Sequence, residues 1–329
     1  MNITLIGLGY WGPNLLRVLN KIGALRSAYD LDVEKVNKFS HDPSYKHIEF
    51  GTDYKDALTD DIDAVVIATP PSTHHTIAVE AMKSGKHVFI EKPMTLDVYE
   101  AEDLTKMAKA LGLILMVGHI FLYVPEVIKI KDIIDSGELG DIVYIHASRL
   151  NLGKFQKANV VSDLAPHDIS IFNFLTDDDV VRVHANGYGF VKKEVVEVAK
   201  ITLEYSRGMV CDLHLSWLDP RKKRVTTIVG TEKMLVYNML AEEKIKIYNK
   251  GVDIQDTSDH AAYMLAYRHG DVYSPYTEVW EPLQKECECF IECINKKESP
   301  LTDGANGVAV VKVLDAALSS LETGGWVTL

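Results

Sequence analysis

The sequence has few cysteines and no long apolar run, and these absences exclude several classes of protein. Four cysteines in 329 residues, three of them between positions 287 and 293, do not give the paired spacing of a disulfide framework. No histidine or fourth thiol accompanies Cys289 and Cys293, so we expect buried thiols and no metal. The longest apolar stretch, residues 111–125, is interrupted by Gly118 and is too short to cross a bilayer. The amino terminus has no basic leader, and we expect a cytoplasmic protein without a membrane partner.

Positive charge is also scarce. The chain has 35 Lys and Arg residues against 47 Asp and Glu residues, and its formal net charge is -12. This balance argues against a nucleic-acid partner, and the basic run Arg221–Arg224 is interpreted as a solvated turn between two strands. A composition of 47% apolar and 25% charged residues is typical of a globular protein, and the length indicates two domains.

An apolar run at residues 3–6 leads directly into a glycine-rich loop. In such a G-x-G-x-x-G loop the first glycine permits a sharp turn, the second allows a pyrophosphate to approach, and the third lets the next helix pack closely. The amino end of that helix then faces the phosphates. We therefore assign the loop to a dinucleotide and place these residues in the cofactor site: Gly7, Gly9, Tyr10, Trp11 and Gly12.

The second apolar strand, residues 24–29, ends at Asp30. A dinucleotide-binding unit places an acid near this position, where it binds the hydroxyls of the adenine ribose. The alternative for Asp30 is a helix cap, a role that Asp32 fits better. Further acidic residues after the strand would repel the additional phosphate of NADP, so the predicted cofactor is NAD.

Residues 1–120 alternate between strand and helix patterns, which predicts a doubly wound parallel sheet, an NAD-binding Rossmann domain. Its strands are expected near residues 3–7, 24–29, 47–50, 63–69, 87–91 and 113–117. The predicted fold class is α/β, a Rossmann domain followed by an α+β domain.

Residues 121–329 are predicted to form this second domain, which binds substrate and mediates oligomerisation around an open, mainly antiparallel sheet. We expect strands at 142–150, 180–190, 197–217, 225–230, 233–238 and 244–248, and a short helix at 166–175. Two helices within 281–322, separated by residues 303–307, could pack back on the first domain. An open sheet face needs covering, so we expect a homo-oligomer, with dimer and tetramer both open. The role of Gly251–Pro275 stays open, as a wall of the sugar pocket or a subunit contact.

Ligands of doubly wound sheets bind at the carboxyl ends of the strands. The fourth strand delivers three residues that we place beside the cofactor: Thr69, Pro70 and His74. The fifth strand ends in Glu91-Lys92-Pro93, where the proline restricts the backbone before it. We predict that Glu91 and Lys92 lie in the cofactor site and that Lys92 is functional, in preference to an ordinary solvated lysine.

A second candidate group lies in the segment Asp163-Leu-Ala-Pro-His167. Four residues apart on a helix, Asp163 and His167 would share a face. Each alone has a structural explanation, Asp163 as a helix cap and His167 as a helix-end histidine. Together with Lys92 they supply a base that titrates near neutrality and a carboxylate that orients it, which alcohol oxidation requires.

The motifs GLGYWGPN, ATPPSTHH, EKP and DLAPHD, in this order, resemble the Gfo/Idh/MocA oxidoreductase family. The resemblance implies that Lys92 binds the reacting hydroxyl and stabilises the alkoxide while His167 accepts the proton. Asp163 would hold His167 or a substrate hydroxyl, and hydride would pass from a sugar carbon to NAD. The segment GHIFLYVP is also similar to the family, and it places His119 in the substrate site.

Other stretches, RLNLGKF and VSDLAPHDISIF among them, are similar to family dehydrogenases that oxidise the 3-hydroxyl of UDP-N-acetylglucosamine or its uronic acid before transamination in polysaccharide biosynthesis. Arg149, Asn151 and Lys154 would then bind the phosphate or carboxylate of a nucleotide sugar, although a charged strand edge explains them equally well. A free-sugar or inositol dehydrogenase, an NAD-using glycosidase and a non-catalytic NAD-binding regulator remain alternatives.

Overall fold

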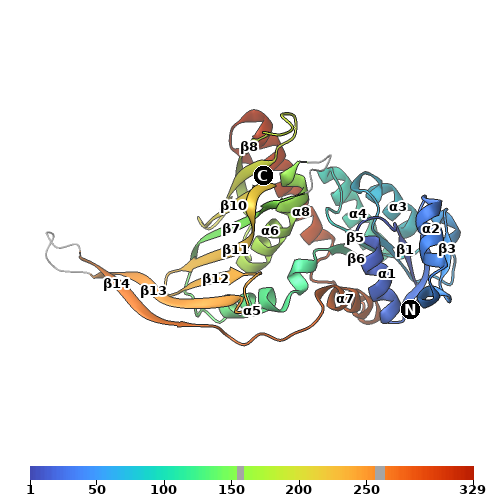
Figure 1. The fold of residues 1–329 in the computed structure, drawn as a ribbon, viewed down its shortest axis with the longest axis horizontal. Helices are drawn as coiled ribbons and strands as arrows, with labels where there is room; N and C mark the ends of the chain where they lie inside the picture. Colours follow the sequence, from blue (N-terminus) through green and yellow to red (C-terminus); the bar gives the residue numbers. More distant parts are fainter. Residues whose placement is uncertain (154–158, 256–263) are drawn as a thin grey trace. The chain divides into compact units, whose positions relative to one another are not determined.

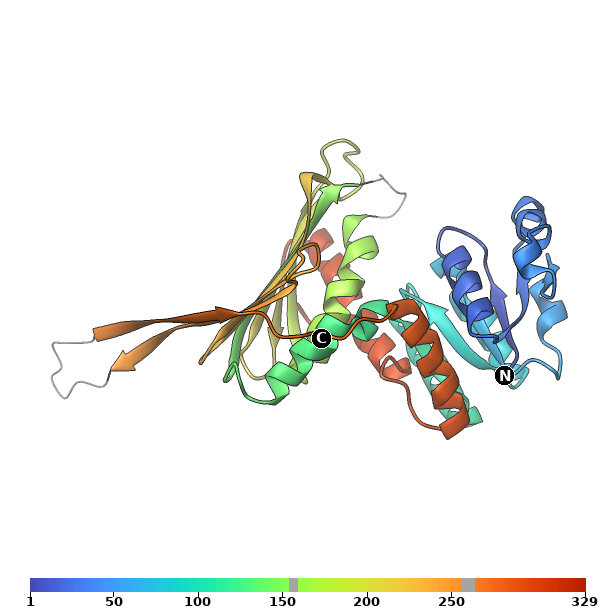
Figure 2. The same cartoon turned by 60° about the horizontal axis from the view of Figure 1, so that its bottom comes forward.

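The computed structural model describes residues 1–153, 159–255 and 264–329 of the chain (Figures 1 and 2). The chain divides into two compact units. The first unit comprises Met1–Val124 and Trp280–Asp315, and the second comprises Pro125–Val279 and Ala316–Leu329.

The first unit contains a six-stranded sheet in the order β3-β2-β1-β4-β5-β6, in which neighbouring strands pair in parallel. Its strands are β1 (Ile3–Ile6), β2 (Leu25–Tyr29), β3 (Glu49–Gly51), β4 (Ala64–Ile67), β5 (His87–Glu91) and β6 (Leu115–Gly118). The predicted doubly wound parallel sheet is confirmed. The strand order reverses between β1 and β4, and such a switch point opens a crevice at the carboxyl ends of the strands.

Helices flank this sheet (Figure 1). They are α1 (Gly12–Lys21), α2 (Val33–Ser40), α3 (His74–Lys83), α4 (Val98–Leu111) and α7 (Pro282–Lys296), with the 3-10 turns η1 (Pro43–Tyr45), η2 (Tyr54–Ala57), η3 (Pro71–Thr73) and η4 (Ile120–Tyr123). Although α7 is distant in sequence, it packs here, because Phe290 meets Phe89 of β5 edge-on at 5.8 Å between ring centroids. A segment near the carboxyl terminus thereby completes the Rossmann core.

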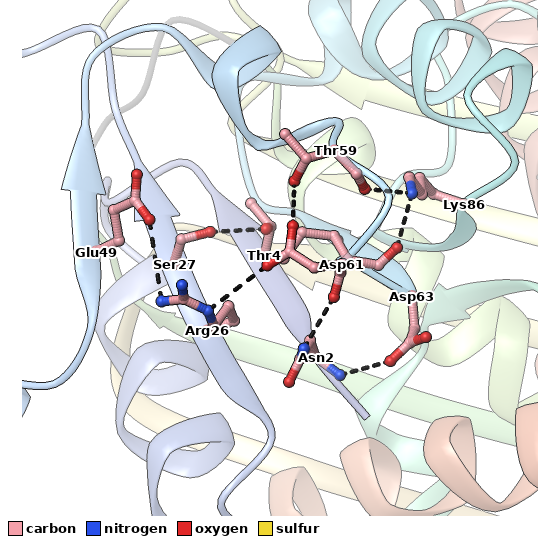
Figure 3. Close-up of polar contacts among 10 residues, drawn as sticks. Asn2, Thr4, Arg26, Ser27, Glu49, Thr59, Asp61, Asp63 and Lys86 are labelled. Atoms are coloured by element: carbon pink, nitrogen blue, oxygen red, sulfur yellow. Dashed lines mark hydrogen bonds and ion pairs between the residues drawn. The ribbon is translucent and has the colours of Figure 1, made fainter.

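Figure 3 shows the polar contacts that close the amino edge of this sheet. The buried Lys86 donates from Nζ to the carbonyl oxygens of Thr59 (2.5 Å) and Ile62 (2.8 Å). The backbone N–H of Asn2 donates to Asp63 over 2.7 Å, and a cavity of about 470 Å³ opens beside these residues. This edge is opposite to the carboxyl edge, so its polar residues serve the fold and not the predicted site.

The second unit contains a nine-stranded sheet within the described residues, in the order β14-β13-β12-β11-β7-β10-β9-β8-β15. Its strands are β7 (Ile142–Leu152), β8 (Val180–Tyr188), β9 (Val198–Tyr205), β10 (Val210–Ser216), β11 (Leu218–Gly230), β12 (Met234–Asn238), β13 (Ile245–Gln255), β14 (Met264–Tyr273) and β15 (Val327–Thr328). Only the pair β7–β10 is parallel among the pairs of this described sheet. The predicted open, mainly antiparallel sheet is confirmed, although the run 197–217 is two strands, and β14 and β15 were not predicted.

The remaining helices are α5 (Pro125–Asp135), α6 (Val160–Thr176) and α8 (Gly304–Thr323). The prediction that a helix begins at residue 166 was wrong. The helix α6 begins after Asn159, whose side chain accepts the Ser162 N–H over 2.8 Å, and Pro166 lies inside it.

The prediction that residues 303–307 separate two helices was also wrong. The side chain of Asp303 accepts the N–H of Asn306 over 2.9 Å, and α8 begins at Gly304. By length and composition α8 could cross a membrane, but half of its most apolar stretch is buried inside the protein. The boundary between the two units lies within this helix.

Candidate active site

The glycine loop after β1 has the geometry that its sequence predicts. Gly7 has φ +102°, and a Cβ there would lie 2.6 Å from the carbonyl group of Ala68. A Cβ at Gly12 would lie 2.1 Å from the carbonyl oxygen of Gly7, so the start of α1 needs glycine to pack this closely. A Cβ at Gly9 would meet no described atom within 4 Å, which leaves this side of the loop open.

The open side of the loop suits a dinucleotide. Trp11 is the N-cap residue of α1 and makes no capping hydrogen bond with its side chain among the described residues. Pro13 has no N–H and the N–H of Asn14 donates to the carbonyl oxygen of Trp11 over 2.9 Å, so the N–H of Gly12 is the donor at the start of α1 that can serve a pyrophosphate. Tyr10 is 92% exposed beside it and can cover a bound cofactor.

Asp30 ties this loop to the end of β2. Its Oδ2 accepts the backbone N–H of Leu8 over 2.7 Å, and its Oδ1 accepts the N–H of Asp32 over 2.9 Å. The Nζ of Lys35 lies 3.4 Å from Oδ1. Asp32 caps α2 by accepting the N–H of Glu34. Since each carboxylate oxygen has two lone pairs, Asp30 retains acceptor capacity for ribose hydroxyls.

Thr69 and Pro70 lie in the loop after β4, and His74 is the first residue of α3. His74 is buried, with Nε2 2.9 Å from the carbonyl oxygen of Thr69 and Nδ1 3.0 Å from that of Pro93. Burial lowers the pKa of His74, against the opposing effect of these carbonyls. The ring joins the loops that follow β4 and β5, and its contact with a cofactor stays a prediction.

Glu91 and Lys92 end β5, and the Lys92–Pro93 peptide bond is cis. The carboxylate of Glu91 accepts the backbone N–H of Lys92 over 3.2 Å and a hydrogen bond from the Trp11 side chain. Burial raises the pKa of Glu91 to about 7, although the Lys92 charge opposes the shift. A Cβ at Gly118 would lie 3.0 Å from this carboxyl group, so glycine leaves room for it.

Two further titratable groups of the first unit are buried near Glu91 and Lys92. Burial, together with the charge of Lys92, lowers the pKa of His119 to about 3, so its ring is neutral. Burial and the charge of Glu91 raise the pKa of Glu286, on α7, well above its usual value. Within the described residues, neither the ring nitrogens of His119 nor the carboxyl oxygens of Glu286 have a hydrogen-bond partner.

His119 is 1% exposed, so its predicted contact with substrate stays a prediction. Glu286 was not predicted from the sequence. A signal was present, because Glu286 lies at helical spacing from the apolar residues Leu283 and Phe290 and therefore falls on the buried face of α7.

In the second unit, Asp163 and His167 both lie on α6 and are half-buried. Their spacing is helical as predicted, so they share a face. Neither structural alternative holds, because Asn159 is the cap of α6 and His167 is in the middle of the helix. The chemical role of both residues stays a prediction.

Arg149 of β7 forms a buried ion pair with Asp168 of α6. The Nε donates to Oδ2 over 2.5 Å and Nη2 to Oδ1 over 2.9 Å, and both side chains are 4% exposed. The pair fixes the helix that carries Asp163 and His167 to the sheet. Asp168 was not predicted as a site residue, although it ends the DLAPHD motif, and the predicted contact of Arg149 with substrate stays a prediction.

Asn151 of β7 accepts a hydrogen bond at Oδ1 from Nη2 of Arg224 over 2.8 Å. Lys154, the third predicted donor, lies outside the described residues. The interpretation of Arg221–Arg224 as a turn was wrong, because these residues belong to β11 and Arg224 pairs with Arg149 of β7. The strand β11 runs through the basic residues although its pairing with β7 is interrupted between Leu218 and Lys223, which a local pattern does not reveal.

Comparison with known proteins bears on both units. Residues 1–119 match the family model "Oxidoreductase family, NAD-binding Rossmann fold", and residues 127–236 match the "GFO/IDH/MocA C-terminal domain". The UDP-N-acetylglucosamine 3-dehydrogenase of Acidithiobacillus ferrooxidans is 29% identical over 324 residues, covering 97% of this chain and 95% of that protein. The scyllo-inositol 2-dehydrogenase (NAD(+)) of Bacillus subtilis is 26% identical, covering 80% and 76%.

Solved structures agree with this similarity. A structure of the Acidithiobacillus ferrooxidans UDP-N-acetylglucosamine 3-dehydrogenase has a TM-score of 0.82 at 25% identity and covers 98% of each chain. A levoglucosan dehydrogenase in complex with NADH has a TM-score of 0.80 at 20% identity, which shows a shared fold.

Proposed function

Because the chain belongs to the Gfo/Idh/MocA oxidoreductase family and begins with an NAD-binding Rossmann domain, we propose that it oxidises the 3-hydroxyl of a UDP-linked N-acetylated sugar to the 3-keto sugar. The observation that carries this choice is the similarity to a UDP-N-acetylglucosamine 3-dehydrogenase along almost the whole of both chains. The inositol dehydrogenases share a shorter part of their length with this chain, and oxidation of a free polyol is the second candidate.

The loop residues Gly7, Gly9 and Gly12 and the carboxylate of Asp30 would hold NAD, which when bound supplies the hydride acceptor. In this proposal Lys92 donates a hydrogen bond to the reacting hydroxyl and stabilises the negative charge that develops on its oxygen. The neutral ring of His119 lies near Lys92 without adding a second positive charge.

We assign removal of the hydroxyl proton to His167, whose usual pKa suits a base near neutrality. Asp163, on the same face of α6, would orient His167 or bind a neighbouring hydroxyl of the sugar. The buried pair Arg149–Asp168 keeps the helix that carries both residues in a fixed place on its sheet.

The test mixes purified protein and NAD with UDP-N-acetylglucosamine, its uronic acid, free N-acetylglucosamine and inositols. Formation of reduced nicotinamide is followed by absorbance, and the 3-keto product is identified by mass spectrometry. An aminotransferase that consumes 3-keto sugars prevents an unfavourable equilibrium from concealing turnover. Turnover of inositols alone would refute the proposed substrate, and no turnover of any sugar would favour the regulator.

The assigned roles are tested with Lys92→Met and His167→Asn. Each should lower kcat by roughly 100- to 10,000-fold, as expected when a group that handles the proton or the developing charge is lost, while NAD binding persists. Lys83→Met and His47→Asn are matched controls, because both side chains are exposed and lie outside the motifs. Wild-type rates in both site variants would refute the assignment.

We also propose that the protein is a homo-oligomer. Within the described residues, α6 covers one face of the second unit's sheet and no helix covers the other (Figure 2). Tyr267 of β14 is 70% exposed, which suits a surface that another copy covers. Sedimentation velocity should show a dimer or tetramer, and a monomer at micromolar concentration would contradict the proposal.

A further inference from the structure

Two arginines lie directly opposite each other on neighbouring strands of the second unit. Arg224 of β11 pairs with Arg149 of β7 in an antiparallel register. Side chains of directly opposite residues project to the same face of a sheet, and like charges in this position destabilise it. Because Arg149 binds Asp168 of α6, the shared face is the one that α6 covers.

Only one of these two charges is neutralised by a described carboxylate. The carboxylate of Asp168 accepts two hydrogen bonds from Arg149. Arg224 donates instead to uncharged oxygens, the carbonyls of Leu150 (3.1 Å) and Lys223 (2.9 Å) and the side chain of Asn151 (2.8 Å). No ion pair to Arg224 within 4.0 Å is present among the residues that the structure describes.

The guanidinium of Arg224 is half-buried, and this burial has an electrostatic cost. Burial and the charge of Arg149 lower the pKa of Arg224 to about 10, while Asp168 and Asp163 act in the opposite direction. The group is still a cation at neutral pH. A partly desolvated cation without a counter-ion is unfavourable, and an anion that binds beside it relieves this cost.

The hydrogen bonds of Arg224 leave a suitable edge for such an anion. Both N–H groups of Nη1 and one of Nη2 are used by the three oxygens named above. An arginine has five N–H donors, so the Nε–H and the second N–H of Nη2 remain with respect to the described residues. A guanidinium binds a carboxylate or phosphate with two hydrogen bonds through donors at Nε and Nη2.

We propose that Arg224 binds an anionic group of the substrate, a phosphate or a carboxylate, and thereby selects charged sugar derivatives over neutral polyols. The inference rests on the proposed function and names the residue that gives it specificity. Asp163 contributes to the electrostatic environment of Arg224, which places the anion site beside the candidate acid–base residues of α6.

The experiment compares wild type with Arg224→Gln and Arg224→Lys on UDP-N-acetylglucosamine, its uronic acid and an inositol. Arg224→Gln should raise KM for the charged substrates by roughly 10- to 100-fold, the loss expected for a charge-assisted hydrogen bond, and leave turnover of the neutral polyol unchanged. Arg224→Lys keeps the positive charge but loses the paired N–H donors, so its KM for the charged substrates should lie between those of wild type and Arg224→Gln. Arg221→Gln removes an exposed charge from the same strand and should behave as wild type.

Binding measurements identify the anion and separate this inference from the proposed function. Calorimetry with UDP and with inorganic phosphate needs no turnover, so it applies even if the enzyme oxidises another sugar. Loss of UDP affinity in Arg224→Gln assigns the diphosphate, whereas unchanged UDP affinity with a raised KM for the uronic acid alone assigns the carboxylate. Equal effects on charged and neutral sugars, or unchanged binding and kinetics throughout, would overturn the inference. Arg224→Lys serves the same comparison if Arg224→Gln does not fold.

Discussion

Breaking the buried ion pair between Arg149 and Asp168 should loosen the helix that carries the candidate acid–base residues. In the variant Asp168→Asn the side chain keeps its shape but loses its charge, and the buried guanidinium of Arg149 loses the carboxylate that accepts two of its hydrogen bonds. Both side chains are 4% exposed in the native protein, so water cannot compensate for the loss.

The magnitude follows from the environment of the pair. Removing one partner of a buried ion pair costs about 3–5 kcal/mol, because the other charge remains desolvated. Replacing both residues with apolar ones, as in Arg149→Met with Asp168→Leu, leaves no buried charge and should cost less than the two single changes together. A loss of about 3 kcal/mol corresponds to roughly a hundredfold faster exchange of amides that open with this helix.

Hydrogen exchange followed by mass spectrometry measures this effect locally. Peptides covering β7 and α6 should exchange faster in Asp168→Asn, while peptides covering β1 and β4 of the first unit serve as an internal control. Wild-type exchange in α6 of both single variants would refute the reasoning. Arg149→Met would then be expected to act on KM alone, as a residue that only binds substrate would.

Three other predictions follow from the described contacts. Asp30→Ala should weaken NAD binding by roughly 10- to 100-fold, measured by calorimetry, because it removes the proposed ribose acceptor and the carboxylate that accepts the Leu8 N–H; unchanged affinity would contradict the ribose role. Burial acts to raise the pKa of Glu197, but three backbone N–H donors lower it below the usual 4.5. The ionised carboxylate should therefore stabilise the fold fully above pH 4.5, and this stabilisation should vanish as the pH falls through the lowered pKa. Thermal melts across the acidic range should show a smaller pH dependence in Glu197→Gln, and identical profiles would oppose this. Glu286→Met should leave the melting temperature unchanged or raise it, because the buried carboxyl group has no described partner; a clear decrease would show that the carboxyl group is satisfied.

Local chemistry was enough to predict most of the first unit. Gly7 has a positive φ and a Cβ at Gly12 would meet the carbonyl oxygen of Gly7, so both requirements for glycine are visible within the loop, and Asp32 caps a helix that begins at the next residue. The second unit was predicted less well where a turn signal was overlooked. The run 197–217 contains Gly208 at φ +88°, and the chain reverses there to form β9 and β10.

The contacts that make up the candidate site depend on pairing between distant segments. Glu286 reaches the environment of Glu91 only because α7 packs beside β5, and nothing near Glu286 in the sequence indicates this. Arg149 and Asp168 meet across a sheet–helix interface. Sequence periodicity predicts which face of an element is buried, but not which residue of another element meets it.

The register of β11 shows why a basic run cannot be interpreted without the sheet. Leu218 pairs with Leu152 of β7, and if that register continued without a break, Arg221 would lie opposite Arg149. The register instead shifts between Leu218 and Lys223, so Arg224 takes this place and Arg221 stays exposed. A register shift by an odd number of residues exchanges the two faces of a strand. Both arginines belong to the same basic run in the sequence, but only Arg224 lies on the face that α6 covers. The opposite expectations for Arg224→Gln and Arg221→Gln therefore test the register itself as well as the anion site.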